Sequence, residues 1–171
     1  MACRGSGVRV PSGPPLRFVE RSELHTQGWV EQTVNTEINP HGLHHVTAIA
    51  SDPQKNVDFY TKTLGLRLVK QTVNFDAPHV WHLYYGDKTG APASILTFFP
   101  WPGVVPGKEG AGLTTATSFS VPLDSIGFWQ QRLKSLGVEN ELATNINGFD
   151  LLKLRDQDGM SVELVGTEGD T

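Results

Sequence analysis

Residues 43–65 read LHHVTAIASDPQKNVDFYTKTLG and predict a β-strand that leads directly into an α-helix. Asp52 is suited to cap the helix N-terminus, and Pro53 fits the first helical position. Gly65 is suited to end the helix in left-handed backbone. The apolar side chains inside the helix recur at helical spacing, at Val57, Tyr60 and Leu64.

The same arrangement recurs 72 residues later, between Asp124 and Gly137 (124 − 52 and 137 − 65). We expect Asp124 to begin a second helix and Gly137 to end it. The apolar face of that helix is predicted at Ile126, Trp129, Leu133 and Leu136. Two similar stretches at a fixed spacing indicate an internal repeat.

Each predicted helix is preceded by one strand and followed by three. The eight strands are predicted at residues 44–50, 67–75, 79–85, 94–99, 115–121, 138–144, 149–154 and 161–165. The pattern predicts an α+β fold of two βαβββ repeats, at about residues 42–101 and 113–166. Because one face of each sheet is covered by its helix, we expect the other faces to form a curved mixed sheet around a cleft.

An imidazole and a carboxylate lie on the first and last of these strands, at His45 and Glu163. Such donors, without a cluster of cysteines, favour a divalent metal such as Fe(II), Mn(II) or Zn(II). The repeat offset places Thr117 opposite His45, with Ala116 or Ser118 as the neighbouring choices, and strand alignment places Thr97 opposite Glu163. The chain therefore offers an incomplete ligand set, with metal ligands at two of four related positions.

Strand alternation puts His82 on the same face as Tyr84, which suggests either a cleft lining or ordinary packing.

Composition excludes several classes of function. The 171-residue chain has a formal net charge of −4 and lacks a basic stripe, which argues against nucleic acid as a partner. Its single cysteine, Cys3, excludes a disulfide framework. No apolar run is long enough to span a membrane, and no signal peptide is apparent, so we expect a cytoplasmic protein that acts on small molecules.

Residues 1–39 are rich in Gly, Pro and Ser and show no periodicity, so we expect a disordered N-terminal extension. A mis-assigned start codon is an alternative explanation for this segment. The folded domain is predicted at residues 40–166. Residues 167–171 are expected to form a short tail.

Residues 40–166 resemble the N-terminal half of hydroquinone-type ring-cleaving dioxygenases, members of the vicinal oxygen chelate superfamily. The words that carry this resemblance are GLHHVTAIA at 42–50, FY at 59–60, LGL at 64–66, VNFD at 73–76, HLYYGD at 82–87 and LTFFPW at 96–101. Glyoxalase I, extradiol dioxygenases and bleomycin-resistance proteins belong to the same superfamily.

The resemblance implies a non-haem Fe(II) site, or in some members Mn(II), with two histidines and one carboxylate, acting on a small phenolic or hydroquinone substrate and O2. It assigns one metal ligand to His45, and it assigns His44 and Thr47 to positions that orient substrate or ligands. In that family the remaining ligands come from a C-terminal half that this chain does not contain. We therefore expect either a truncated or partial chain, or a homodimer in which His45 of one copy faces Glu163 of the other.

Two alternative functions remain open. A glyoxalase-I-like lyase would use Zn(II) or Ni(II) and would want ligands at all four repeat-related positions, which Thr97 and Thr117 do not provide. A binding module like the bleomycin-resistance proteins would need a cleft lined with aromatic side chains and no metal.

Overall fold

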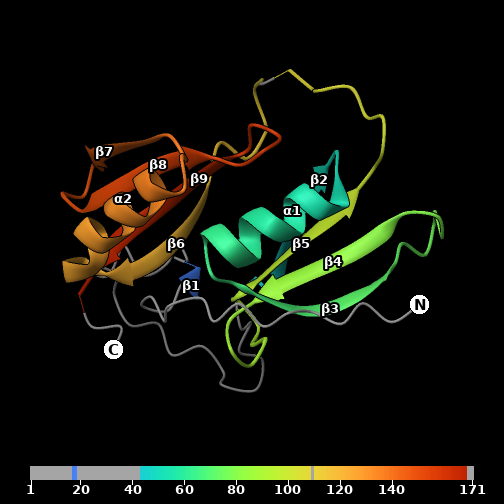
Figure 1. The fold of residues 1–171 in the computed structure, drawn as a ribbon, viewed down its shortest axis with the longest axis horizontal. Helices are drawn as coiled ribbons and strands as arrows, with labels where there is room; N and C mark the ends of the chain where they lie inside the picture. The colour runs from blue at the N-terminus through green and yellow to red at the C-terminus, as the bar shows by residue number, and fades with distance from the viewer. Residues whose placement is uncertain (1–16, 19–42, 109, 169–171) are drawn as a thin grey trace, which may run out of the picture.

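The computed structural model describes residues 17–18, 43–108 and 110–168. They form two sheets, each with a helix against one face (Figure 1). The N-terminal extension and the end of the predicted tail lie outside the described residues, apart from β1 (Arg17–Phe18), which pairs antiparallel with β6. Among the described residues, no helix is long and apolar enough to cross a membrane.

The first repeat contains β2 (His45–Ala50), α1 (Pro53–Asp58), a π-helical turn (Phe59–Thr63), β3 (Arg67–Val73), β4 (Trp81–Gly86) and β5 (Ile95–Pro100). Its strands are ordered β2-β5-β4-β3, and β2 runs parallel to β5. The first strand of the repeat therefore lies next to its last strand.

The second repeat contains β6 (Thr117–Pro122), a 3-10 turn (Leu123–Ser125), α2 (Ile126–Ser135), β7 (Asn140–Thr144), β8 (Asp150–Arg155) and β9 (Ser161–Thr167). Its strands follow the same order, β6-β9-β8-β7, with β1 added at the outer edge of β6. The parallel pair is β6 and β9. The two βαβββ repeats and the α+β class predicted from the sequence are thus confirmed.

The signals that begin and end the first helix act as predicted. The Asp52 carboxylate accepts hydrogen bonds from the backbone N–H groups of Gln54 and Lys55 at 2.8 and 2.9 Å. Gly65 follows the helix with a φ of 76°. A residue with a side chain would be strained in this left-handed conformation, which is why glycine occupies it.

The second helix begins differently from the prediction. Asp124 lies within the 3-10 turn that precedes α2, and the Ser125 hydroxyl donates to the Pro122 carbonyl oxygen at 2.6 Å. At the other end, Leu136 is 49% exposed, so its place in the predicted apolar face is wrong. Leu136 follows the last residue of α2, beyond the stripe formed by Ile126, Trp129 and Leu133.

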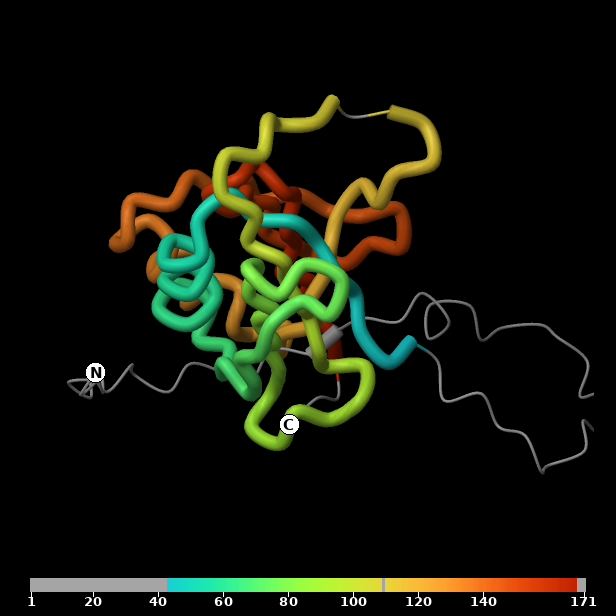
Figure 2. The backbone as a smooth tube through the Cα atoms, turned by 90° about the vertical axis from the view of Figure 1, so that its right-hand side faces the viewer, coloured from blue at the N-terminus to red at the C-terminus, as the bar shows by residue number. Residues whose placement is uncertain are grey.

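The helix-covered faces of both sheets share one hydrophobic core. It is centred on Tyr60 and Phe98 of the first repeat and on Phe119, Trp129 and Leu164 of the second, each at most 2% exposed. The segment between β5 and β6 arches over one end of the molecule and joins the repeats (Figure 2). Since the covered faces are joined in one core, the opposite, open face of each sheet lies outside that core.

Candidate functional site

The alternation of β2 places His45 and Thr47 on the open face of the first sheet. Both residues are exposed, whereas Val46 and Ala48 between and after them pack against the core. Successive strand residues point to opposite faces, so the two polar side chains share one surface. His45 is therefore accessible to a ligand that approaches this face.

His44 contacts His45 directly. Their Nδ1 atoms lie 2.9 Å apart, and the two rings meet edge to face at a centroid distance of 5.2 Å. With Nδ1 of His45 occupied in this way, Nε2 is the atom on which His45 would bind a cation. The arrangement agrees with the orienting role predicted for His44, which stays a prediction.

Thr47 is paired with a buried threonine on the neighbouring strand. The hydroxyl oxygens of Thr47 and Thr97 lie 2.8 Å apart, and the two residues are register partners across β2 and β5. Thr97 is 0% exposed. Its hydroxyl thus fixes the Thr47 hydroxyl on the open face.

His82 and Tyr84 lie on the same open face, as the alternation of β4 predicts. Tyr84 is the register partner of Thr97, so it lies two strands from Thr47 in one cross-strand row. The Tyr84 hydroxyl and His82 Nδ1 share a hydrogen bond of 2.9 Å.

The His82 imidazole contacts two aromatic rings that are tilted relative to it. The Tyr84 and Phe99 rings lie at centroid distances of 4.1 and 4.2 Å, with interplanar angles of 37° and 36°. Burial lowers the pKa of His82 below its usual 6.5, and the charges of His45 and Lys70 lower it further. The Lys70 ammonium lies 5.3 Å from the centre of the Tyr84 ring, a cation–π contact.

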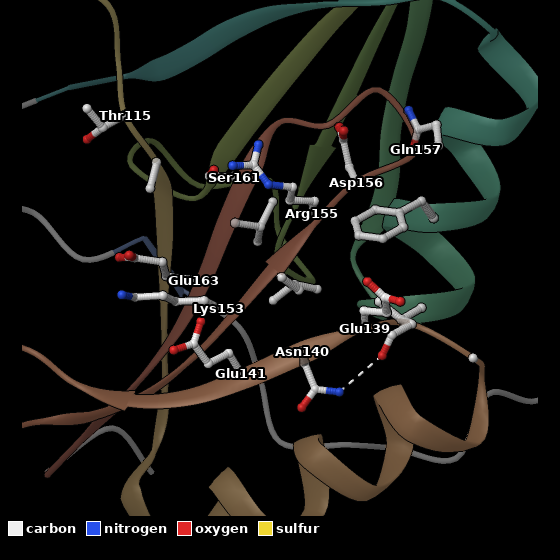
Figure 3. A pocket seen from close by; sticks show the side chains of 16 residues that line it. Thr115, Glu139, Asn140, Glu141, Lys153, Arg155, Asp156, Gln157, Ser161 and Glu163 are labelled. Atoms are coloured by element: carbon white, nitrogen blue, oxygen red, sulfur yellow. Dashed lines mark hydrogen bonds between the residues drawn. The ribbon is translucent and has the colours of Figure 1, made fainter. Parts of the chain in front are cut away.

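Glu163 occupies the open face of the second sheet. It is the register partner of Ser118 on β6 and of Lys153 on β8, and the Ser118 hydroxyl donates to its Oε2 at 2.8 Å. A pocket of about 820 Å³ lies here, and Figure 3 shows polar and charged side chains around it. The lining includes Glu139, Glu141, Lys153, Arg155, Ser161 and Glu163.

The two repeats place different residues at equivalent positions. If Thr97 is aligned with Glu163, as predicted from the sequence, their register partners Thr47 and Ser118 are aligned as well. This correspondence gives an offset of 71 (118 − 47), and the equivalent of His45 is then Ala116 (45 + 71). Of the three residues considered from the sequence, the register thus selects Ala116, which has no donor atom in its side chain.

His45 and Glu163 line different surfaces. None of the first-sheet residues His45, Thr47, His82 and Tyr84 borders the pocket beside Glu163. In the part of the chain that the structure describes, no group of three or more His, Cys, Asp or Glu side chains could hold a metal ion. The structure brings His44, Thr47, His82 and Tyr84 onto the face of His45, but it does not bring Glu163 there.

Two residues of the open face were missed by the predicted site. Phe99 could have been found from the alternation of β5, since it lies two residues after Thr97 on the open face. Lys70 could not, because the register of β3 shifts between Leu68 and Lys70. Such a register shift changes which side chains lie on the open face of the sheet, and it leaves no clear signal in the sequence.

Comparison with known proteins defines the class of the chain. Residues 42–164 match the model of the Glyoxalase/Bleomycin resistance protein/Dioxygenase superfamily. The chain belongs to this superfamily, as its paired βαβββ repeats also indicate.

The relatives that the chain resembles are named as ring-cleaving enzymes. It is 46% identical over 129 residues to the Bacillus subtilis (strain 168) protein named "Putative ring-cleaving dioxygenase MhqO", covering 74% of this chain and 40% of that protein. It is 43% identical over 94 residues to the chlorohydroquinone/hydroquinone 1,2-dioxygenase of Sphingobium indicum, covering 54% of this chain and 29% of that protein. The chain therefore spans 40% or less of the length of these two relatives.

Solved structures give the same fold. The chain matches a Bacillus subtilis structure described as a "putative dioxygenase" with a TM-score of 0.71 and 45% identity, covering 74% of this chain and 41% of that one. It also matches the fosfomycin resistance protein FosX from Listeria monocytogenes with a TM-score of 0.55 and 16% identity, covering 74% of this chain and 93% of that one. At that low identity the second match supports the fold alone.

Proposed function

We propose that residues 40–166 act as the N-terminal domain of a non-haem Fe(II) ring-cleaving dioxygenase of the hydroquinone type. The observation that carries this proposal is the position of His45, which is exposed on the open face of β2 and held at Nδ1 by His44. Identity of 43–46% to proteins named as ring-cleaving dioxygenases supports it.

The residues of one chain fit only part of a metal site. A non-haem iron site of this class needs two histidines and one carboxylate with open positions. The described residues hold no group of three such donors, and Glu163 lies on a different surface. The chain would therefore contribute His45 to Fe(II), or to Mn(II), and the other ligands would come from a C-terminal domain or a second copy.

The chemistry that iron supplies in such enzymes is the reaction of a phenolic substrate with O2, while the protein binds and orients the reactants. In this chain His44 would orient His45, and Thr47, fixed by Thr97, would offer a hydroxyl beside it. The rings of Tyr84 and Phe99, which pack against His82, would support an aromatic substrate through stacking.

A metal-binding experiment tests the role of His45. Mn(II) is titrated into the chain, and broadening of backbone amide signals near Val46 and Thr47 is followed by NMR. We expect broadening centred on β2 that is lost in His45→Ala. A matched control is His79→Ala, which removes another imidazole, one that contacts Trp101 rather than His45. Equal broadening in His45→Ala and the native chain would contradict the proposal.

A measurement of oxygen uptake tests whether the chain supplies a complete set of iron ligands. We expect the isolated chain to bind Fe(II) weakly and to consume little oxygen with hydroquinone, because it supplies one of three ligands. Tight stoichiometric iron with steady oxygen uptake would show that the ligand set is completed by the chain itself or by a second copy. Sedimentation of the same sample separates these two cases.

A binding module is the second candidate, favoured by the absence of a three-donor group among the described residues. Phenol binding that is unchanged by His45→Ala and needs no metal would favour it. The glyoxalase-like lyase has less support, since Thr97 and Ala116 occupy repeat-related positions where it would need ligands.

A further inference from the structure

Tyr84 and His82 form a hydrogen-bonded pair on the open face of the first sheet. They lie on β4, two strands away from β2, which carries His45. The row of register partners runs from Thr47 on β2 through Thr97 on β5 to Tyr84 on β4. Neighbouring strands are about 4.8 Å apart, so the backbones of Thr47 and Tyr84 are separated by about 10 Å. His45 precedes Thr47 by two residues on the same face, so His45 and Tyr84 share the open face, one row of register partners apart.

The hydroxyl of Tyr84 is held in place by its surroundings. It shares a 2.9 Å hydrogen bond with His82 Nδ1, and the His82 ring contacts the rings of Tyr84 and Phe99. The Lys70 ammonium lies over the Tyr84 ring, 5.3 Å from its centre. A phenol held by His82 and Lys70 loses little freedom when it binds a ligand, which favours a specific hydrogen bond.

His82 serves Tyr84 rather than a ligand. Its Nε2 atom is buried and has no hydrogen-bond partner among the described residues, so it is not accessible to a bound molecule. A buried imidazole nitrogen without a partner lowers the stability of the fold. The contacts of the His82 ring with its aromatic neighbours and its hydrogen bond to Tyr84 hold it in place despite this cost. Tyr84 is half-buried, so its side chain remains in reach of the open face.

We propose that the Tyr84 hydroxyl, positioned by His82, binds the hydroxyl of the substrate that lies para to the one beside His45. This inference rests on the proposed function, because it takes His45 as the end where the first hydroxyl binds. A hydroquinone carries its two hydroxyls at opposite ends of the ring, whereas a catechol carries both at one end. Tyr84 would thus select para-dihydroxybenzenes over catechols.

The test compares three phenols on the metal-free chain. Hydroquinone, catechol and 4-methylphenol are titrated against chain with labelled tyrosine and histidine side chains, and binding is followed by NMR at Tyr84 and His82. Since 4-methylphenol replaces the para hydroxyl by a methyl group of similar size, we expect it to bind about fivefold more weakly than hydroquinone, as for loss of one neutral hydrogen bond. We expect catechol to bind as weakly as 4-methylphenol.

The variants separate a direct role from a structural one. In Tyr84→Phe, hydroquinone should no longer bind more tightly than 4-methylphenol. The ratio of the dissociation constant of 4-methylphenol to that of hydroquinone should therefore fall towards one. Tyr85→Phe is the matched control, because Tyr85 is the next residue on β4 and its hydroxyl donates to Asn56 on the helix-covered face. His82→Phe should lower the ratio through a misplaced Tyr84 hydroxyl, and His82→Gln, which keeps a hydrogen-bonding group, should restore part of it.

Two results would overturn the inference. One is a hydroquinone preference that survives Tyr84→Phe, and the other is no perturbation of Tyr84 by hydroquinone. The proposed function fails by a different measurement, namely Mn(II) broadening that does not depend on His45. The two failures are therefore distinguishable in the same preparation of chain.

Discussion

The hydroxyl of Tyr60 donates a 3.0 Å hydrogen bond to Oδ2 of Asp156, joining the helix of the first repeat to the turn between β8 and β9. Both residues are buried, at 0% and 7% exposure. Oδ1 of Asp156 accepts from the backbone N–H groups of Asp158 and Met160, each at 2.9 Å. A single carboxylate therefore orders its own turn and connects it to the other repeat.

Tyr60→Phe is expected to lower the free energy of unfolding by about 1–3 kcal/mol, because it leaves a buried acceptor without its donor. Urea denaturation measures the change. A double-mutant cycle with Asp156→Ala should give a coupling energy of at least about 0.5 kcal/mol, since the two side chains are in contact. Additive effects of the two substitutions would contradict an energetic link between the repeats.

Alkaline pH is expected to destabilise the fold through two buried tyrosines. Burial and the nearby Asp156 carboxylate raise the pKa of Tyr60 well above its usual 10.0, and burial raises the pKa of Tyr85. The folded state thus holds protons that the unfolded state releases, so the free energy of unfolding falls as pH rises above about 10.

The phenolate absorbance of Tyr84→Phe measures the ionisation of the two buried tyrosines directly, because only Tyr60 and Tyr85 remain of the three tyrosines. We expect the absorbance to rise together with unfolding. A full rise near pH 10 with an intact fold would contradict the prediction.

Mild acid is expected to weaken the fold through His82. Its pKa is lowered in the folded state, so the folded chain binds fewer protons than the unfolded chain as pH falls below 6.5. Stability is therefore retained above pH 6.5 and decreases below it, towards the lowered pKa of the folded state. Urea denaturation between pH 7.5 and 5.5 should show a smaller decrease in His82→Phe than in the native chain. Equal decreases in the two proteins would exclude His82 as a cause.

Gly166 and Gly127 are expected to respond oppositely to alanine. A Cβ at Gly166 would lie 2.9 Å from Leu123 Cδ1 and 3.3 Å from the Asp150 carbonyl oxygen. Gly166→Ala should therefore cost about 1–3 kcal/mol through overpacking. A Cβ at Gly127, in α2, meets nothing within 4 Å, so Gly127→Ala should be neutral or stabilise by up to about 1 kcal/mol. Thermal unfolding of both variants compares them, and a loss at Gly127 equal to that at Gly166 would refute the packing argument.

Much of the architecture could be predicted from local signals. Asp52, Pro53 and Gly65 mark the first helix because capping and left-handed backbone depend on a few neighbouring residues. The alternation of β4 grouped His82 with Tyr84 on one face, since side-chain direction follows from strand geometry.

The relation between the two open faces could not be predicted in the same way. It depends on how the repeats pack, through long-range contacts such as the bond from Tyr60 to Asp156. His45 and Glu163 therefore looked like partners in the sequence but line different surfaces in the structure. The equivalence of His45 with Ala116 needed the strand register, because the repeat offset differs by one residue between helices and strands.

Arg132 of α2 donates hydrogen bonds to the backbone carbonyl oxygens of Thr63, at 2.9 Å from Nε, and of Lys62, from Nη2. The last carbonyl groups of a helix have no partner within the helix, so they need donors from elsewhere. Here the donor belongs to the other copy of the motif. A single repeat would therefore leave these two carbonyl groups to water and would expose the core residues that now pack against the other repeat.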